Sequence, residues 1–253
     1  MKLPKAASAS RQATRARPVK AKPAKHTAPT RGKSLETYAK LIAAAGELLG
    51  EVGFEKLTSN AICARAKLTP PAFYRYFRDK YEVLEVLARR LLARQNDAYA
   101  AWLLQGGSWA DLERQSKSLE EWFRIAADIV AREPGAVWTL RALRALPNLA
   151  HVRVESQRMN TNRLFEFYRR VLPELDPQLL WYRLRVRSEF GWVVDELAVE
   201  EDRLPHDVLF REAARLVGRA LVDDTGIAAI AADQRLSRSV ANTIENPSKR
   251  RYR

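Results

Sequence analysis

The sequence predicts an all-α protein in which a small N-terminal three-helix unit is joined by a long helix to a larger helical domain. Apolar residues recur three and four positions apart through most of the 253-residue chain, which is the spacing of amphipathic helices. No stretch alternates apolar and polar residues as a half-buried strand does. Prolines and glycines interrupt the helical pattern at intervals that separate individual helices.

The net charge of +14 lies almost entirely at the two ends of the chain. Residues 1–33 contain ten Lys or Arg and no acid, residues 245–253 have a net charge of +3, and residues 34–244 carry only +1. The N-terminal segment has few large apolar residues, so we expect a disordered arm. Three roles remain open for it: a solvated linker, a nonspecific phosphate-binding arm, or an organelle transit peptide. Residues 231–253 are expected to form a flexible basic tail.

Several classes of protein are excluded by composition and motifs. Cys63 is the single cysteine, so it forms no internal disulfide, and with three scattered histidines it builds no cysteine-based zinc site. These features indicate a reducing cytoplasm. No uncharged apolar run approaches the ~18–20 residues of a membrane span. Phosphate-binding glycine loops, H-E-x-x-H and G-x-S-x-G are missing, so the sequence predicts no enzyme and no cofactor.

The N-terminal unit begins with a helix whose apolar face runs from Leu35 to Val52. Ser34 is its expected N-cap and Gly53 its expected stop. A short second helix over 58–66 is expected to be capped by Thr58 or Ser59. Cys63 is expected to be a small, semi-buried residue of this helix.

A third segment over 70–77 follows the short link at 67–68, and Thr69 is expected to cap it. Its two prolines lie in the first turn, where a helix tolerates them. Asp79, with Glu82 three residues later, then begins a long fourth helix that reaches about Leu104. Two short helices braced by a longer one describe a helix-turn-helix, with the motif at about 57–77.

The third segment carries the most specific signal. Phe73 and Phe77 are four residues apart and are expected to face the core. Tyr74, Arg75 and Tyr76, with Lys80 just beyond, offer hydroxyl and basic groups suited to phosphate oxygens. A core position is the alternative for Tyr74.

With these motifs, residues 37–87 resemble the DNA-binding domain of the TetR family of bacterial transcriptional regulators. The match includes Leu49-Gly-Glu-Val-Gly-Phe54, Ile62-Cys-Ala-Arg-Ala-Lys-Leu68 and Thr69-Pro-Pro-Ala-Phe-Tyr-Arg-Tyr-Phe-Arg-Asp-Lys80. The family usually has glycine where this chain has Pro71, which leaves the operator sequence open. The resemblance implies that the third helix enters the major groove. It implies phosphate contacts from Thr58, Ser59, Tyr74, Tyr76 and Lys80, base-edge contacts from Pro70, Ala72 and Arg75, and a place for Thr69 in the same DNA-binding set.

The remaining two-thirds of the chain predicts further helices over about 108–132, 136–146, 149–171, 177–199 and 207–222. The resemblance implies that this region binds an effector and dimerises through the last two long helices. All six tryptophans lie beyond the DNA-binding part and either line a ligand pocket or belong to the core: 102, 109, 122, 138, 181 and 192. Arg141, Arg144, His151 and Arg153 form either an anion site or a solvated face.

We therefore expect four segments: a disordered arm at 1–33, a TetR-type helix-turn-helix domain at 34–94, a ligand-binding and dimerisation domain at 95–230, and the tail. The expected function is a homodimeric repressor that binds a palindromic operator in double-stranded DNA and is released by a small-molecule effector. No membrane partner is expected. The alternative is an α-helical DNA-coating or protein-interaction protein that uses its basic termini without sequence choice.

Overall fold

The computed structural model describes residue 29 and residues 31–104, 112–171, 173 and 175–222. Within these ranges every regular element is a helix, which confirms the all-α prediction. The predicted basic arm lies almost wholly outside the described residues, and the predicted tail and Trp109 lie wholly outside them.

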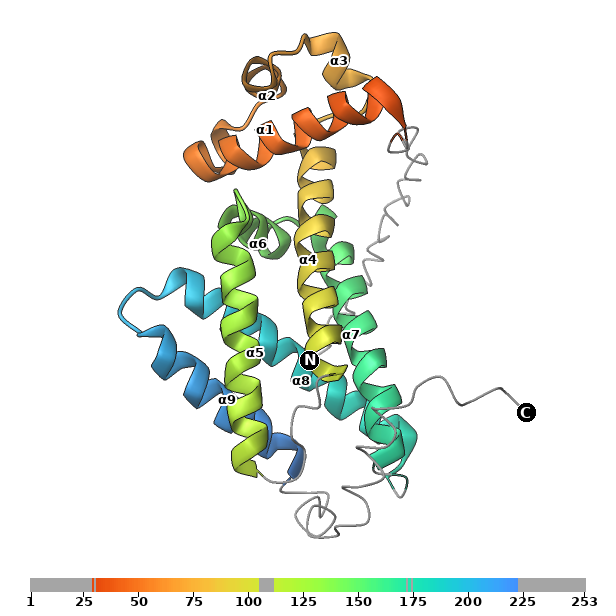
Figure 1. Cartoon of the computed structure of the whole chain (residues 1–253), viewed down its shortest axis with the longest axis vertical. Coiled ribbons are helices and arrows are strands. Elements are labelled where there is room, and N and C mark those ends of the chain that lie inside the picture. Colours follow the sequence, from red (N-terminus) through yellow and green to blue (C-terminus); the bar gives the residue numbers. More distant parts are fainter. Residues whose placement is uncertain (1–28, 30, 105–111, 172, 174, 223–253) are drawn as a thin grey trace, which may run out of the picture.

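Three helices form the N-terminal domain at the top of the molecule (Figure 1). They are α1 (Gly32–Lys56), α2 (Ser59–Ala66) and α3 (Pro70–Tyr74). Gly53 leaves helical geometry with φ 75°, so the predicted interruption of α1 is confirmed, although one more turn follows it. A residue with a side chain is strained at positive φ, which explains why glycine occupies this position.

Two predicted helix ends in this domain are wrong. The first helix begins at Gly32, and its N-cap position is Arg31, which makes no side-chain capping bond. Ser34 lies inside the helix, where its hydroxyl hydrogen-bonds to Tyr76 Oη at 2.8 Å. The third helix ends at Tyr74 instead of residue 77, because the chain turns there to bring Tyr76 and Phe77 into the core.

The core of this domain consists of aliphatic and aromatic side chains that are almost completely buried. Phe73 and Phe77 are 0% and 2% exposed, and their rings lie 5.4 Å apart, as their spacing predicts. Tyr38 of α1 stacks on Phe77 at 5.2 Å. This packing fixes α3 against α1.

The long helix α4 (Lys80–Leu104) descends from this domain into the rest of the molecule (Figure 1). Asp79 caps it by accepting hydrogen bonds from the backbone N–H groups of Tyr81 and Glu82 at 2.9 and 3.1 Å. Glu82 accepts from the backbone N–H of Arg78 at 2.6 Å, one residue earlier than a capping box requires.

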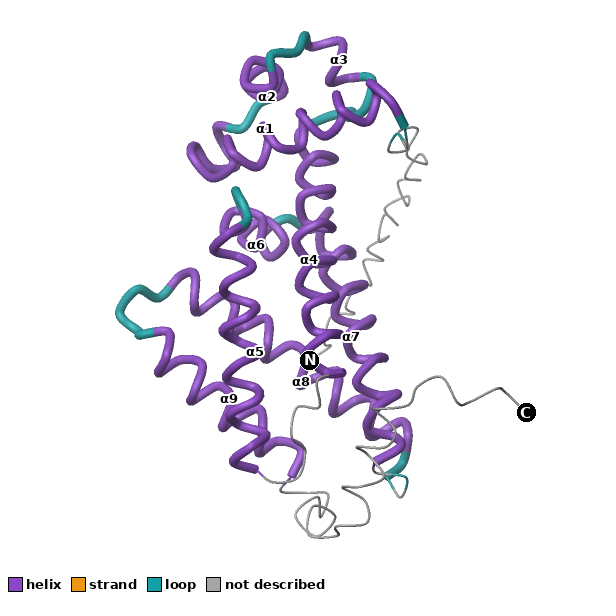
Figure 2. The backbone as a smooth tube through the Cα atoms, viewed as in Figure 1, coloured by secondary structure: helices purple, strands orange, loops and turns teal. Residues whose placement is uncertain are grey.

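The C-terminal helices lie beside α4 and below the N-terminal domain (Figure 2). Their predicted ends agree with the structure to within a few residues. The elements are α5 (Leu112–Arg132), α6 (Ala136–Ala145), the 3-10 turn η1 (Pro147–Leu149), α7 (Ala150–Val171), α8 (Pro177–Glu200) and α9 (His206–Val222). The helix pairs α5–α9 and α7–α8 make the most extensive contacts.

A glycine-lined contact joins the N-terminal domain to α6. A Cβ on Gly46 would lie 3.1 Å from Pro134 O, and one on Gly135 would lie 2.5 Å from Gly46 O. The ring of Trp138 rests on Gly53, where a Cβ would lie 2.9 Å from it. The missing side chains therefore let α1 and the start of α6 touch backbone to backbone. We call these contacts the glycine seam.

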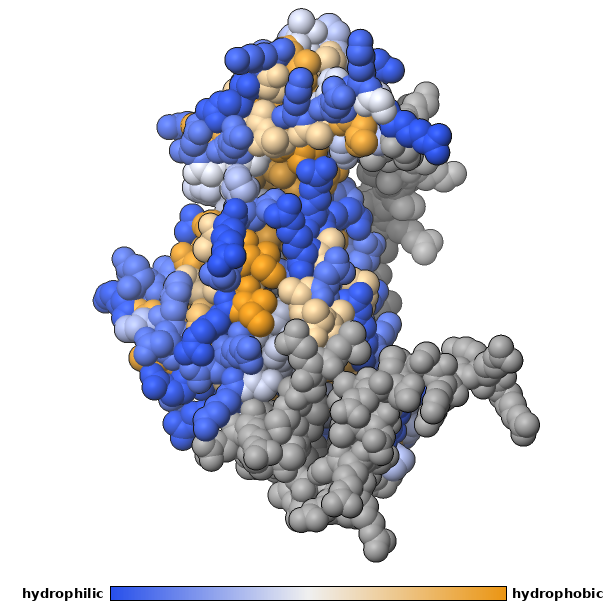
Figure 3. Space-filling view, in the orientation of Figure 1, coloured by the Kyte–Doolittle hydropathy of each residue, from blue (hydrophilic) through white to orange (hydrophobic). Residues whose placement is uncertain are grey.

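None of the described helices is long and apolar enough to cross a membrane. In the view of Figure 3, hydrophilic side chains predominate around the N-terminal domain, and apolar ones gather between α4 and α5 below it.

Candidate nucleic-acid interface and ligand cavity

The turn between α2 and α3 is defined by local hydrogen bonds. Thr58 Oγ1 accepts from the backbone N–H of Ala61 at 3.1 Å, so Thr58 is the N-cap of α2 as predicted. Lys67 ends α2 in the left-handed region with φ 56°, and the Leu68 N–H donates to Cys63 O at 2.9 Å. Thr69 occupies the N-cap position of α3 without a side-chain capping bond.

The aromatic residues of α3 divide between the core and the surface. Phe73 is buried, whereas Tyr74 is 52% exposed, so the alternative of a core position for Tyr74 is wrong. Thr69, Pro70 and Arg75 are also exposed, and Ala72 is partly exposed. These side chains of α3 and its first turn therefore form one accessible surface at the end of the molecule.

A hydrogen bond joins this surface to the start of α2. Tyr74 Oη and Ser59 Oγ lie 3.1 Å apart, and both side chains have polar atoms near the N-terminus of α2. Because helix N-termini present unpaired N–H groups and a partial positive charge, this corner is suited to an anion such as a phosphate.

Two residues of the predicted set point away from this surface. Tyr76 is 8% exposed, and its hydroxyl bonds to Ser34. Lys80 Nζ donates to Phe54 O at 3.0 Å and lies 4.2 Å from the centre of the Phe54 ring. Lys80 therefore ties the start of α4 to the end of α1. The sequence pattern gives its position but not its direction.

Neighbouring charges are partly committed to internal ion pairs. Arg65 of α2 pairs with Glu51 at 2.5 Å and Glu47 at 3.3 Å, and its hydrogen bond lowers the pKa of Glu51. Arg78 pairs with Glu82 at 2.5 Å. Lys67 is an exposed base at the turn that sequence reasoning missed, because its position depends on the left-handed backbone between α2 and α3.

Cys63 is buried at 2% exposure and lies near the turn. Its thiol points to Thr69 O at 3.7 Å, and burial raises its pKa. A raised pKa disfavours the thiolate, so the environment is that of a structural cysteine. Its burial is more complete than the semi-buried position that the sequence predicts.

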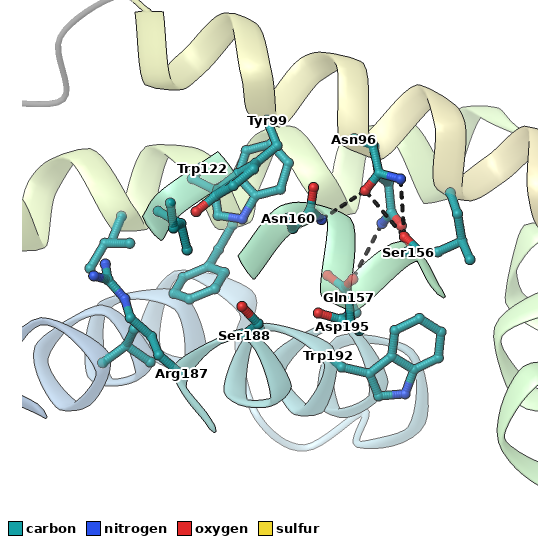
Figure 4. Close-up of a pocket in the computed structure, with 17 residues that line it drawn as sticks. Asn96, Tyr99, Trp122, Ser156, Gln157, Asn160, Arg187, Ser188, Trp192 and Asp195 are labelled. Carbon is teal, nitrogen blue, oxygen red and sulfur yellow. Dashed lines mark hydrogen bonds between the residues drawn. The ribbon is translucent and has the colours of Figure 1, made fainter. Parts of the chain in front are cut away.

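A second candidate site is a cavity of about 80 Å³ between α4, α5, α7 and α8 (Figure 4). Three tryptophan positions meet around it or next to it: Trp122 and Trp192 line it, and Trp102 packs beside Trp122 at 5.9 Å. Polar side chains cover another part of its wall, and they are Gln95, Asn96, Ser156, Gln157, Asn160, Ser188 and Asp195.

The polar wall is organised by hydrogen bonds. Asn96 exchanges bonds with Ser156 at 3.0 and 3.2 Å and accepts from Asn160 Nδ2 at 2.7 Å. Gln95 Nε2 donates to Asp195 Oδ2 at 3.2 Å. The pKa of Asp195 is raised to about 7, mainly because the carboxyl is buried; the hydrogen bond from Gln95 opposes this rise, and the charge of neighbouring Glu196 contributes to it.

The four basic residues considered as an anion site each lie beside an acid. Arg144 binds Glu196 at 2.5 Å, Arg153 binds Glu189 at 2.8 Å, and His151 lies 3.4 Å from Glu85. Arg141 lies 4.0 Å from Glu200. These pairings favour the solvated face over the anion site. The described residues contain no cluster of His, Cys, Asp and Glu that could hold a metal ion.

The compact trihelical unit, with α3 presented on a fixed aromatic core, defines a helix-turn-helix DNA-binding protein. Residues 41–87 match the family model "Bacterial regulatory proteins, tetR family". This stretch is therefore similar to the DNA-binding domain of tetR-family regulators, and the described helices share the fold of such regulators.

Three solved structures share this fold. A TetR-like transcriptional regulator from Rhodococcus sp. RHA1 is 17% identical, covers 77% of this chain and 100% of its own, and has a TM-score of 0.51. The fatty acid degradation regulator FadR from Bacillus halodurans is 18% identical, with 76% and 98% covered and a TM-score of 0.50. FadR from Thermus thermophilus, a repressor in complex with lauroyl-CoA, is 20% identical, with 72% and 94% covered and a TM-score of 0.52. No curated protein sequence gives a significant match.

Proposed function

We propose that this regulator is a homodimeric repressor that binds a palindromic operator and leaves it when a small molecule occupies the C-terminal domain. The observation that carries the proposal is the exposed surface of α3, held on the Phe73–Phe77 core within the region that matches the family. A helix presented in this way has the shape and exposure needed to enter a major groove.

Within this proposal, the surface of α3 has two kinds of DNA contact. Thr58 and Ser59 at the start of α2 bind phosphates, together with Tyr74 of α3, which is hydrogen-bonded to Ser59. Arg75, Pro70, Thr69 and Ala72 meet the bases, and Arg75 pairs with a guanine for ~1–3 kcal/mol of discrimination. Tyr76 and Lys80 do not contact DNA in this proposal. Their hydrogen bonds to Ser34 and to the backbone carbonyl of Phe54 hold the helix-turn-helix in place.

The dimer would form through an apolar stripe on α8. Six exposed apolar side chains recur every three or four residues on this helix, so they share one face. Between α8 and α9, Tyr182, Val186, Phe190 and Leu216 line a groove of about 440 Å³. The six are Leu179, Tyr182, Val186, Phe190, Val193 and Leu197. Apolar stripes of this length usually mark a protein interface, and a second copy offers the same face under two-fold symmetry.

The dimer has a direct test in sedimentation analysis of the full chain. Val186→Glu places a charge at a side chain that is 59% exposed, so the monomer should still fold while the dimer dissociates. Met159→Glu, at 40% exposure on α7, is the matched control and should stay dimeric. A dimer that is insensitive to Val186→Glu contradicts this interface.

In this proposal, ligand binding in the cavity changes the position of the DNA-binding domain through contacts made by α6. Trp192, on the cavity wall, donates to Glu196 Oε1 at 2.7 Å, and Arg144 of α6 binds the other oxygen. The start of α6 meets α1 at the glycine seam. A ligand that moves Trp192 therefore acts on a contiguous set of contacts that ends at α1.

Selection from random oligonucleotides, followed by titration at two salt concentrations, tests the function. We expect one palindrome to be favoured over scrambled DNA by about 10³-fold or more. Arg75→Ala should weaken operator binding more than binding to scrambled DNA. The matched variant Lys67→Ala should weaken both DNAs equally. If no palindrome is enriched, the protein is not a sequence-specific regulator.

The proposed domain boundaries are those expected from the sequence, with α4 crossing the limit at residue 94. The basic arm is proposed to add affinity without sequence choice. Deleting residues 1–28 should lower affinity for all DNA and flatten the salt dependence while the operator preference is retained. Loss of that preference would give the arm a role in recognition.

A further inference from the structure

Asp195 is a carboxylate in the wall of the cavity that no described cation neutralises. Gln95 donates one hydrogen bond to it, and no ion pair to it forms among the described residues. A carboxylate withdrawn from water is unfavourable unless it is paired or protonated. The fold therefore leaves the partly buried Asp195 with one hydrogen bond and no opposite charge among the described residues.

Another charged residue of α8 lines the cavity, but its hydrogen bond goes to a residue other than Asp195. Arg187 also lines the cavity, but its guanidinium donates to Tyr168 Oη at 2.9 Å. It precedes Asp195 by eight residues, which is ~12 Å along a helix. In the view of Figure 4, Ser188 lies between Arg187 and Asp195. Apart from these two residues, Tyr99 is the ionisable side chain of the lining.

A second polar group of the wall is an unsatisfied acceptor. Asn160 Nδ2 donates to Asn96, whereas the buried Oδ1 of Asn160 has no hydrogen-bond partner among the described groups. A buried acceptor without a donor is rare and calls for an explanation. Asp195 and Asn160 therefore each offer an acceptor to a ligand, and Asp195 adds a negative charge on its side of the wall.

The apolar part of the lining is aromatic. Tyr99 and Trp122 stand edge to face with ring centres 4.8 Å apart, and Figure 4 shows both reaching toward the cavity. The faces of Trp and Tyr attract cations. At about 80 Å³, the cavity is smaller than the ~300–1,000 Å³ of pockets for drug-sized ligands.

We propose that the cavity binds a small organic cation, an ammonium group on a short aromatic or apolar body, with Asp195 as its counter-ion. This inference rests on the proposed effector control and names the chemical class of the effector. The ammonium supplies the donors that Asp195 and Asn160 lack, and the aromatic rings enclose the apolar body. Since the pKa of Asp195 is raised to about 7, binding near neutral pH should release a proton from it.

Matched probes on one phenylalkyl frame test the chemistry: 2-phenylethylammonium, 2-phenylethanol and 3-phenylpropionate, with lauroyl-CoA as a separate arm. Binding to the full chain is measured by tryptophan fluorescence and thermal shift at pH 8, with homologous ammonium probes of shorter and longer chain. We expect the best ammonium to bind at least tenfold more tightly than its matched alcohol, and the carboxylate to bind most weakly.

Asp195→Asn should remove the preference for the ammonium over the alcohol and leave alcohol binding unchanged. Asp128→Asn removes an exposed carboxylate of α5 that pairs with Arg132 and should leave the preference intact. Equal binding of ammonium and alcohol by the unmodified protein overturns the proposal. So does retention of the preference in Asp195→Asn, binding of lauroyl-CoA alone, or no binding by any ammonium probe.

Operator binding is measured with the same protein preparations, so that failure of the cation proposal can be distinguished from failure of the proposed regulator function. A protein that selects a palindrome but ignores ammonium probes is a regulator with a different effector, and the cation proposal fails. Selective ammonium binding that depends on Asp195 supports the proposal even where the probe leaves the operator complex intact. In that case the release step fails.

Discussion

The interior of the N-terminal domain and the layer between α4, α7 and α8 differ in polarity. Among the described residues, all the buried polar or charged side chains lie at position 95 or later, and they are Gln95, Asn96, Thr139, Ser156, Gln157, Thr161 and Arg187. The N-terminal interior is aliphatic and aromatic. An apolar core is stable and rigid, which suits a surface that must match DNA, whereas buried polar groups cost free energy unless a partner satisfies them.

The two regions are nevertheless in contact. The apolar cluster that contains Phe73 and Leu84 continues through α6 and reaches Trp192 on the cavity wall. A rigid reading surface and a polar, unsatisfied cavity therefore share one set of packed side chains. Substitutions in the N-terminal core should therefore change both the free energy of unfolding and operator binding. Substitutions at the glycine seam and at Asp195 should change mainly the free energy of unfolding.

Phe73→Ala should have the largest effect on stability. It removes a fully buried ring from the N-terminal core, which costs about 3–5 kcal/mol, and it should abolish operator binding because α3 loses its support. The free energy of unfolding is measured by circular dichroism in urea. Val52→Ala, at 39% exposure in the same domain, should change stability by less than about 0.5 kcal/mol. Similar losses in both variants would show that Phe73 does not support the domain.

Gly135→Ala should have the next largest effect, because it disturbs the seam between the two regions. Gly135 has φ 74°, and a Cβ there would lie 2.5 Å from Gly46 O, so we expect a loss of about 2–3 kcal/mol. Gly191→Ala is the matched control. Its Cβ meets nothing within 4 Å inside α8, so it should stabilise the protein by about 0.5–1 kcal/mol. The thermal unfolding midpoints of the two variants should therefore move in opposite directions.

Asp195→Asn should stabilise the protein without ligand, and the gain should depend on pH. The folded pKa is raised to about 7 from an ordinary value of 3.8, so the unfolded chain loses this proton first as the pH rises. Stability contributed by the protonated group is thus present below pH 4 and is lost between about pH 4 and 7. The variant should gain stability above pH 7 and little at pH 4, because a neutral amide does not ionise in the partly buried site. An equal gain at both pH values would contradict ionisation of Asp195 as the cause.

The sequence could predict features that depend on neighbouring residues, but not contacts between residues far apart in the chain. Helical spacing and prolines located the helices, and the Phe73–Phe77 spacing gave the inward face of α3, because these features depend on local periodicity. Lys80 illustrates the limit. Its spacing matches the family motif, but its direction depends on Phe54, 26 residues earlier. The cavity brings Gln95 and Asp195 together from helices 100 residues apart, and no local pattern encodes that contact.

Tyr74→Phe should have the smallest effect on stability and a clear effect on function. The hydroxyl is exposed and bonds to Ser59, so its removal should change the free energy of unfolding by less than about 0.5 kcal/mol. Operator affinity should nevertheless fall about three- to tenfold, the equivalent of one hydrogen bond to a phosphate. Tyr81→Phe is the matched control, because Tyr81 is also exposed, at 39%, but lies on α4 and outside the proposed dimer interface. Fluorescence anisotropy with labelled operator should find Tyr81→Phe close to the unmodified protein. Equal affinities for both variants would mean that the Tyr74 hydroxyl serves only its bond to Ser59, and the phosphate contact at the start of α2 would then depend on Thr58 and the backbone N–H groups.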